Sequence, residues 1–150
     1  MITFQIENWS ECVDEVAQLV TDHWREVAND RDKIPLDPDW EKYRNMDKAG
    51  ILVLMTVRDD GVMVGYSLFV VMSLTHYKSN TVAMNDIIYV HPKYRGPRVG
   101  MRFIEFCHKE LAQSKVHRIC WHIKPVNNWT PILLRMGYRV EEYVVGICLI

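Results

Sequence analysis

The chain has 150 residues, of which 49% are hydrophobic and 25% are charged, and its formal net charge is -1. This length predicts a single globular domain that buries about two-thirds of its surface. The near-neutral charge gives no strong nucleic-acid signal, because bulk nucleic-acid binding requires a basic face. No apolar run approaches the roughly 20 residues of a membrane span. The N-terminus has no signal-like pattern, so we expect a cytoplasmic protein.

The sequence predicts a series of strands and helices. In chain order we predict a strand over 2–7, a helix over 10–28, a helix near 38–48, strands over 51–57, 62–74 and 81–90, a helix over 99–114, a strand over 117–124, a short helix over 130–137 and a strand over 138–150. Ser10 is placed to cap the first helix, and Asp37-Pro38 favours the start of the second. Asp60-Gly61 predicts a tight hairpin turn.

This order predicts the fold class. The pattern β-α-α-β-β-β-α-β-α-β indicates an α/β (α+β layered) domain, with a mixed, mostly antiparallel sheet of six or seven strands and about four helices. The segment 81–124 is predicted to be a parallel crossover unit. The last stretch, 138–150, is apolar enough for a strand buried on both faces. Its apolar part, 143–150, would favour a homodimer if its edge is left uncovered.

No metal or disulfide motif is present. The four cysteines include no C-x-x-C pair, and the six histidines include no H-x-x-x-H pair. We therefore predict reduced core thiols and no metal site.

The most informative stretch is 89–100, YVHPKYRGPRVG, which joins a predicted strand to a predicted helix. Backbone N–H groups at a helix start, together with small residues, predict an anion site. Pro97 contributes no N–H to such a site. Arg98 and Arg102 stand where the helix dipole disfavours cations, and a polyanionic ligand between them would account for this.

Two side chains are candidate general bases. His122 lies in an alternating strand, and an imidazole pKa of about 6.5 suits proton abstraction near neutrality; the alternative is a half-exposed strand histidine without a chemical role. Asp86 lies between apolar residues of the strand 81–90, predicted on the same face as Ile88 and Val90. It could accept a proton directly or through water, or it could pair with a basic side chain and hold the sheet.

An acidic group of residues precedes and opens the second helix. Its members are Asp30, Asp32, Asp37, Asp39 and Glu41. The group could attract a cationic amine, or it could consist of solvated loop and cap residues.

The predicted order and two motifs resemble the GNAT superfamily of N-acetyltransferases. The first motif is V-x-P-x-Y-R-G-x-x-x-G over 90–100, in which Arg98 replaces the middle glycine of the family's phosphate loop. The second is the ending formed by Asn127, Asn128 and then Met136-Gly137-Tyr138. Leu133 occupies the family's tyrosine position, which would weaken general-acid catalysis.

The resemblance implies that acetyl-CoA binds between the fourth and fifth strands, and that its acetyl group moves to a small-molecule or peptide amine by direct attack. The cofactor-binding residues expected on this basis are Val90, Arg95, Gly96, Arg98, Val99, Gly100, Met101, Asn127 and Asn128. Leu133 and Arg98 leave an alternative open: a regulatory or interaction protein that binds acyl-CoA without chemistry.

Overall fold

The computed structural model describes residues 1–96 and 98–150, so Pro97 lies outside the described residues. The elements are β1 (Ile2–Glu7), α1 (Trp9–Val27), α2 (Trp40–Lys48), β2 (Leu52–Asp59), β3 (Val62–Leu74), β4 (Tyr77–Val90), a 3-10 turn (Pro92–Tyr94), α3 (Val99–Gln113), β5 (Arg118–Cys120), a second 3-10 turn (Pro125–Asn127) and α4 (Thr130–Arg135). This order matches the predicted one up to the last helix. The α/β prediction is therefore confirmed, with one strand fewer than the pattern predicted.

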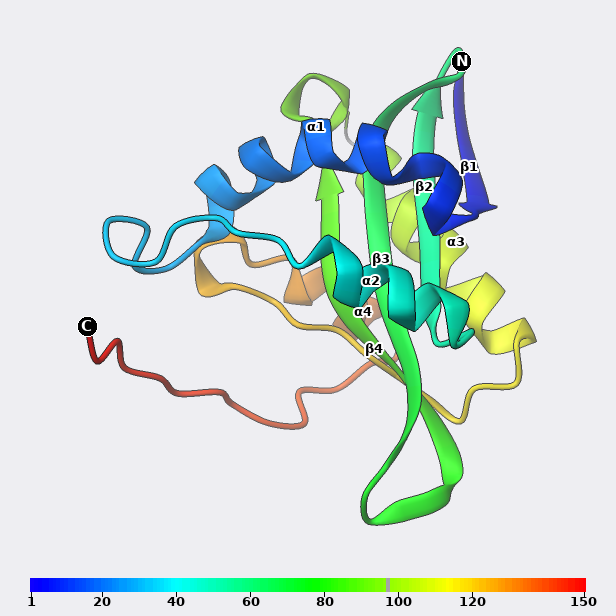
Figure 1. Cartoon of the computed structure of the whole chain (residues 1–150). Coiled ribbons are helices and arrows are strands. Elements are labelled where there is room, and N and C mark those ends of the chain that lie inside the picture. The colour runs from blue at the N-terminus through cyan, green and yellow to red at the C-terminus, as the bar shows by residue number, and fades with distance from the viewer. Residues whose placement is uncertain (97) are drawn as a thin grey trace.

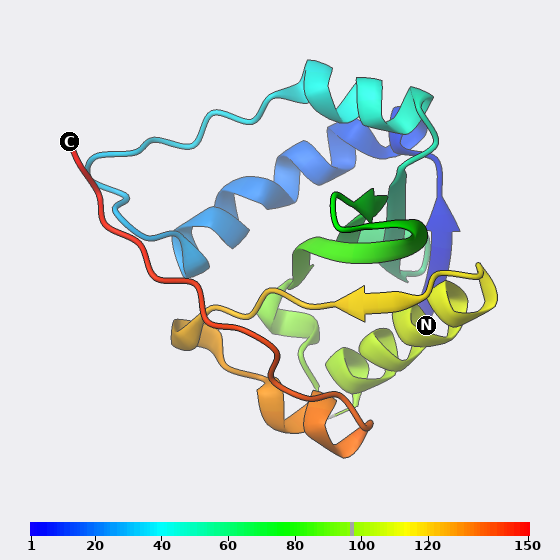
Figure 2. The ribbon, with the colours of Figure 1, turned by 90° about the horizontal axis from the view of Figure 1, so that it is seen from below.

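The strands form one mixed sheet in the order β1-β2-β3-β4-β5. The first three pairings are antiparallel and β4 pairs with β5 in parallel. α1 and α2 cover one face of this sheet, and α3 covers the other (Figures 1 and 2). The described part of the sheet has five strands, so the prediction of six or seven was wrong.

Each face of the sheet has its own hydrophobic core. On the face covered by α1 and α2, Trp9, Val16, Tyr66 and Leu68 form one buried cluster. On the α3 face, a second buried cluster centres on Phe103. Because aromatic and branched side chains alternate between these clusters, the sheet is held from both sides. In the part of the chain that the structure describes, no helix has both the length and the apolarity to cross a membrane.

Two predicted helix caps were displaced by two residues. α1 begins after Asn8 rather than at Ser10, and in α2 the carboxylate of Asp39, not Asp37, accepts a hydrogen bond from Lys42 N–H at 2.8 Å. An aspartate two residues further along satisfies the same first-turn donor, so composition alone did not separate the two positions. The hairpin prediction is confirmed, because Asp60 and Gly61 have φ values of 48° and 87°, the backbone region such turns require.

The C-terminal segment forms no strand, contrary to prediction. Residues 138–150 form neither helix nor strand and run along the edge of the domain (Figures 1 and 2), and Val145, Ile147 and Leu149 are 96%, 84% and 87% exposed. An apolar segment becomes a strand only when an edge is available to pair with it, and the described part of β5 is three residues long. The predicted homodimer through this segment stays a prediction.

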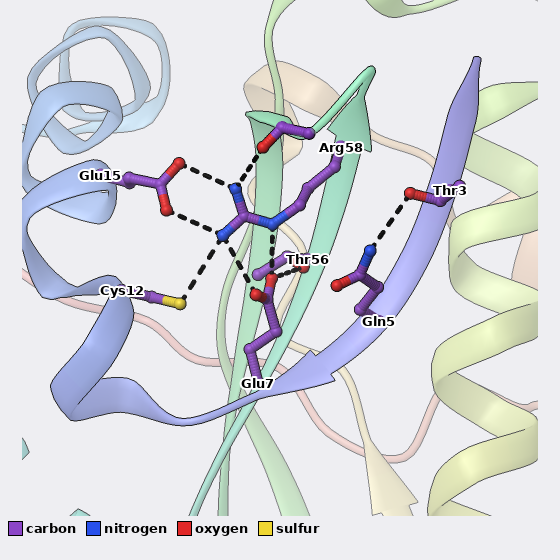
Figure 3. Close-up of polar contacts among 8 residues, drawn as sticks. Thr3, Gln5, Glu7, Cys12, Glu15, Thr56 and Arg58 are labelled. Carbon is purple, nitrogen blue, oxygen red and sulfur yellow. Dashed lines mark hydrogen bonds and ion pairs between the residues drawn. The ribbon is translucent and has the colours of Figure 1, made fainter.

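A buried arginine ties the first helix to the sheet (Figure 3). Arg58 of β2 donates from Nε to Glu7 Oε2 at 2.8 Å and from Nη2 to Glu15 Oε1 at 2.8 Å. Its Nη1 also donates to the carbonyl of Gly61 at 2.8 Å. One guanidinium thus joins β1, α1 and the β2–β3 turn.

The carboxylates respond electrostatically to this guanidinium. Burial alone would raise the pKa of Glu7, but hydrogen bonds from Arg58 and Thr56 outweigh it and lower that pKa. The hydrogen bond from Arg58 likewise lowers the pKa of Glu15. Both carboxylates are therefore ionised at neutral pH and hold the arginine in place.

We expect Arg58→Met to destabilise the protein by about 3 kcal/mol, because it leaves two partly buried carboxylates without their counterion. The control is Arg25→Met on α1: Arg25 makes an exposed ion pair with Asp22, which is worth at most about 1 kcal/mol. Urea unfolding of both variants measures the difference. Equal losses in the two variants would contradict a structural role for the Arg58 network.

Candidate functional site

β5 covers only a short part of one side of β4. β5 pairs with β4 only through Val82, Ala83 and Met84. β4 then continues to Val90, whereas β5 ends at Cys120. Residues 85–90 therefore form an open edge of β4 within an otherwise paired sheet. A backbone edge of this kind has N–H and C=O groups available to a ligand.

An irregularity in β4 sets the direction of Asp86. The ladder between β3 and β4 pairs Phe69 with Asn85 and then Leu68 with Ile87, so Asp86 is an extra residue without a partner. Such bulges re-aim side chains and are frequent near functional sites.

The bulge overturns the predicted face of Asp86. Asp86 Oδ2 accepts a hydrogen bond from Tyr43 Oη of α2 at 2.7 Å, so it lies on the face covered by α1 and α2. Ile88 and Val90 pack into the opposite core. The extra residue breaks the strict alternation on which the prediction rested. The partner of Asp86 is therefore a tyrosine hydroxyl and not the basic side chain that was predicted as one alternative.

The end of β4 directs backbone groups of Val90 toward the open edge. His91 N–H donates to the Val64 carbonyl of β3 at 2.8 Å. Because successive backbone groups of a strand alternate sides, the N–H and C=O of Val90 point away from β3. The carbonyl accepts a hydrogen bond from Arg95 Nε at 2.6 Å. The Val90 N–H therefore faces the open edge beside a carbonyl that is already satisfied.

Arg95 is exposed at the surface, but all three of its guanidinium nitrogens donate to groups of the protein itself. Its Nη1 and Nη2 donate to both oxygens of Glu26 on α1, at 2.7 and 2.6 Å, and Asn127 Nδ2 donates to the same carboxylate at 3.3 Å. The guanidinium also lies 5.4 Å from the centre of the Tyr89 ring. Fork-to-fork pairing of this kind fixes geometry as well as charge, so Arg95 anchors the loop after β4 to α1.

The other predicted asparagine also has an internal partner. Asn128 Oδ1 accepts a hydrogen bond from Thr130 N–H at 3.0 Å, at the start of α4. It therefore shapes the approach to that helix.

The loop before α3 retains the features of the predicted anion site. Arg98 is exposed and is the N-cap of α3, with no side-chain cap bond and no acidic residue in the first turn. The N–H groups of Gly100 and Met101 lie in that first turn, where α-helices have no internal acceptor. A Cβ added at Gly96 or Gly100 would meet no atom within 4 Å. The space in front of the loop is open.

His23 lies near the open edge and was not among the predicted site residues. The ring of His23, on α1, lies 5.2 Å from that of Tyr89 and 6.3 Å from that of Tyr66. Burial lowers the pKa of His23 from 6.5 to about 4, with Arg95 acting in the same direction and Glu26 and Asp86 against it. The imidazole is therefore neutral at neutral pH. Its burial could have been predicted from its position on the apolar face of α1, three residues after Val20.

The surrounding phenols are also neutral. Burial raises the pKa of Tyr43, and its hydrogen bond to Asp86 adds to the effect. Burial likewise raises the pKa of Tyr66 and Tyr89. The Tyr66 hydroxyl is buried and has no hydrogen-bond partner among the residues that the structure describes. This face of β4 thus gathers neutral rings around the carboxylate of Asp86.

His122 lies on the other side of the open edge. It is exposed, two residues beyond the end of β5, next to Trp121, whose ring packs against Phe69 and Trp129. The structure gives no hydrogen bond between His122 and Asp86. Asp86 lies in β4, whereas His122, which was predicted within a strand over 117–124, lies beyond the end of β5. Among the described residues no group of three His, Cys, Asp or Glu side chains could hold a metal ion.

The sequence matches a family model, described as the acetyltransferase (GNAT) family, over residues 13–138. The chain belongs to the GNAT acetyltransferase family. A comparison with curated protein sequences finds no match.

Solved structures share the fold of this acetyltransferase across nearly its whole length. A predicted acetyltransferase from Clostridium acetobutylicum, crystallised with acetyl-CoA, is 15% identical, with 99% of this chain and 97% of that chain covered and a TM-score of 0.68. A ribosomal-protein-alanine N-acetyltransferase from Brucella melitensis biovar Abortus 2308 is 14% identical, with coverage of 100% and 99% and a TM-score of 0.70. AAC(6')-Iy in complex with a bisubstrate analogue, CoA-S-monomethyl-acetylneamine, is 16% identical, with coverage of 99% and 97% and a TM-score of 0.71. At these identities the likeness shows the fold alone.

Leu133, which by resemblance stands at the family's tyrosine position, is a buried residue of α4 with 5% exposure. A leucine side chain has no proton to donate, so the resemblance predicts no general acid at this position.

The buried imidazole predicts a pH effect on stability. His23 binds a proton near pH 6.5 in the unfolded chain but only near pH 4 in the folded protein. The unfolded state therefore binds more protons between these values, and stability falls as the pH drops through this window. A tenfold change in proton affinity is worth about 1.4 kcal/mol, so the loss from this residue should reach about 2–3 kcal/mol.

His23→Leu should lack this loss. Urea unfolding at about pH 7.5 and about pH 4.5 gives the change for each protein, and the acid losses from Glu7 and Glu15 are common to both. Parallel declines in wild type and variant would contradict a buried neutral His23.

Proposed function

We propose that this protein is an acetyl-CoA-dependent N-acetyltransferase that moves an acetyl group to a primary amine by direct attack. The observation that carries the proposal is the open edge of β4, which runs directly into an exposed arginine and the first turn of α3. Such an arrangement offers backbone donors to an extended ligand at one end and an anion site at the other. A structural neighbour crystallised with acetyl-CoA supports the same assignment.

The residues before and within α3 would hold the pyrophosphate. The N–H groups of Gly96, Val99, Gly100 and Met101 are the candidate donors, although Val99 N–H also donates to the Gly96 carbonyl at 3.1 Å. The exposed guanidinium of Arg98 would add a charge-assisted contact. Arg95, Asn127 and Asn128 were predicted to touch the cofactor. Their internal hydrogen bonds favour a supporting role, in which they hold the loop and the start of α4.

Acetyl-CoA would supply the thioester. The amine must lose a proton to become nucleophilic, and Asp86 or His122 would accept that proton, directly or through water. The nitrogen then bonds to the carbonyl carbon, the Val90 N–H stabilises the negative oxygen, and the carbon–sulfur bond breaks. A thiol pKa of about 8.5 allows departure as thiolate, which offsets the buried Leu133.

Arg98→Ala should raise the KM for acetyl-CoA by roughly tenfold and leave kcat nearly unchanged, because a charge-assisted contact is worth about 1.5–3 kcal/mol. Lys93→Ala is the matched control: it removes an exposed positive charge from the 3-10 turn before the loop. Release of free thiol from acetyl-CoA, measured against cofactor concentration, gives both constants. A KM equal to that of Lys93→Ala would remove Arg98 from the phosphate site.

Asp86→Asn should lower kcat by about 100-fold, since a positioned base contributes that much or more. Tyr43→Phe keeps the carboxylate and removes only its hydrogen-bond donor, so its effect should be smaller. His122→Gln tests the alternative base in the same assay with a panel of amines. Wild-type rates in both Asp86→Asn and His122→Gln would exclude both residues as proton acceptors.

The second candidate is an acyl-CoA-binding regulatory or interaction protein without catalysis. It is motivated by Leu133, which is buried where a proton donor would be expected, and by Arg98 in place of a loop glycine. A rise in melting temperature with acetyl-CoA, without thiol release across the amine panel, would favour this candidate.

A further inference from the structure

A cavity lined by aromatic side chains lies between the two N-terminal helices and the sheet. It has a volume of about 220 Å³. Trp9 and Trp24 of α1 and Trp40 and Tyr43 of α2 form part of its wall, and Ile87 of β4 forms part of its floor. The connection between α1 and α2 closes another side through Leu36 and Asp37.

The rings of Trp9, Trp40 and Tyr43 form one connected group. The ring centres of Trp9 and Tyr43 lie 4.9 Å apart, and those of Trp9 and Trp40 lie 6.1 Å apart. Trp9 is buried, whereas Trp24, Trp40 and Tyr43 are half-buried. Rings that retain exposed surface beside a cavity present apolar area and π faces to a ligand.

The cavity meets the candidate catalytic carboxylate at one residue. Tyr43 contributes its ring to the wall, and its hydroxyl donates to Asp86 at 2.7 Å. Ile87, on the floor, is the next residue in β4. A ligand that fills the cavity therefore has its end beside Asp86 and the open edge.

Two polar features, one in the cavity wall and one in the core beneath it, favour a cationic group. Asp37 lines the cavity and adds a second carboxylate to that of Asp86. The Tyr66 hydroxyl, in the same core as Trp9 and Leu68, is buried without a partner among the described residues. An ammonium group is attracted by carboxylates and by the faces of Trp and Tyr rings, and an amine N–H can donate to a phenol oxygen.

We infer that this cavity binds the apolar body of the acceptor, which is a primary amine carried on a single aromatic ring or a short alkyl chain. The inference rests on the proposed function and narrows its substrate class. The amine nitrogen lies at Asp86, and the ring lies among Trp24, Trp40 and Tyr43. In this arrangement Asp37, from the predicted acidic group, binds the amine together with the aromatic wall.

The volume sets the size of the ligand. A dry cavity of about 150 Å³ lined by apolar side chains holds one benzene molecule. A cavity of about 220 Å³ therefore accepts one ring with a short linker. A molecule of several linked sugars is too large and too polar for it, so we do not expect aminoglycosides to be the preferred acceptors.

The test compares amines with different carbon skeletons and uses a substitution that fills the cavity. Acetyl transfer from acetyl-CoA is measured with 2-phenylethylamine, spermidine and kanamycin, on wild type, Leu36→Trp and Ile34→Trp. Leu36 lines the cavity, so the larger side chain fills it. Ile34 belongs to the same connection, is 48% exposed and does not line the cavity, so its variant is the matched control.

We expect 2-phenylethylamine to have a kcat/KM at least roughly tenfold above those of spermidine and kanamycin, since even single methylene groups in apolar pockets are worth that factor. Leu36→Trp should lose at least roughly tenfold for 2-phenylethylamine, whereas Ile34→Trp should match wild type. A preference for spermidine or kanamycin, or equal rates in Leu36→Trp and wild type, would overturn the inference while leaving acetyl transfer intact.

Calorimetry separates this inference from the proposed function. Wild type titrated with 2-phenylethylamine should bind it, and 2-phenylethanol, which lacks the charge, should bind more weakly. If no amine is acetylated, the proposed function fails, but binding that is lost in Leu36→Trp alone would still support the cavity as an amine site. Absence of binding to wild type would falsify the inference in either case.

Discussion

The structure depends on how the backbone of β4 is satisfied after β5 leaves it. Beyond Met84 the sheet gives this strand no neighbour on one side, and unpaired backbone groups away from water are costly. The Val90 carbonyl is instead bonded by Arg95, which the Glu26 carboxylate holds in turn. One ion pair between α1 and the loop therefore maintains the edge on which the proposed chemistry relies.

The same face of the sheet disfavours charged forms of its side chains by excluding water. Burial lowers the pKa of the His23 imidazole and raises the pKa of the three nearby phenols, so all four groups are uncharged at neutral pH. The carboxyl group of Asp86 is exposed and lies at the border of this group. An isolated carboxylate beside neutral rings attracts a cation more strongly than one surrounded by basic side chains. This contrast between neighbours supports the proposed amine acceptor.

Sequence patterns predicted the elements and the loop, but not the connections between distant residues. The strand over 2–7 and the turn at Asp60-Gly61 were predicted from local signals, and both were confirmed, although Ile6 is 53% exposed. The Glu26–Arg95 and Tyr43–Asp86 contacts join residues far apart in the chain, and no local pattern encodes them. The bulge at Asp86 reversed a face that alternation had predicted. The C-terminal strand failed because apolar composition does not provide a pairing edge.

Helix α1 carries parts of both proposed binding regions within a single turn. Trp24 borders the aromatic cavity, and Glu26, two residues later, holds the arginine of the loop. Because a rigid helix moves both side chains together, the proposed sites imply that the affinities for acceptor and acetyl-CoA are linked. Substitutions on α1 that change the affinity for the acceptor should then also change the affinity for acetyl-CoA, and their combined effects should depart from simple addition.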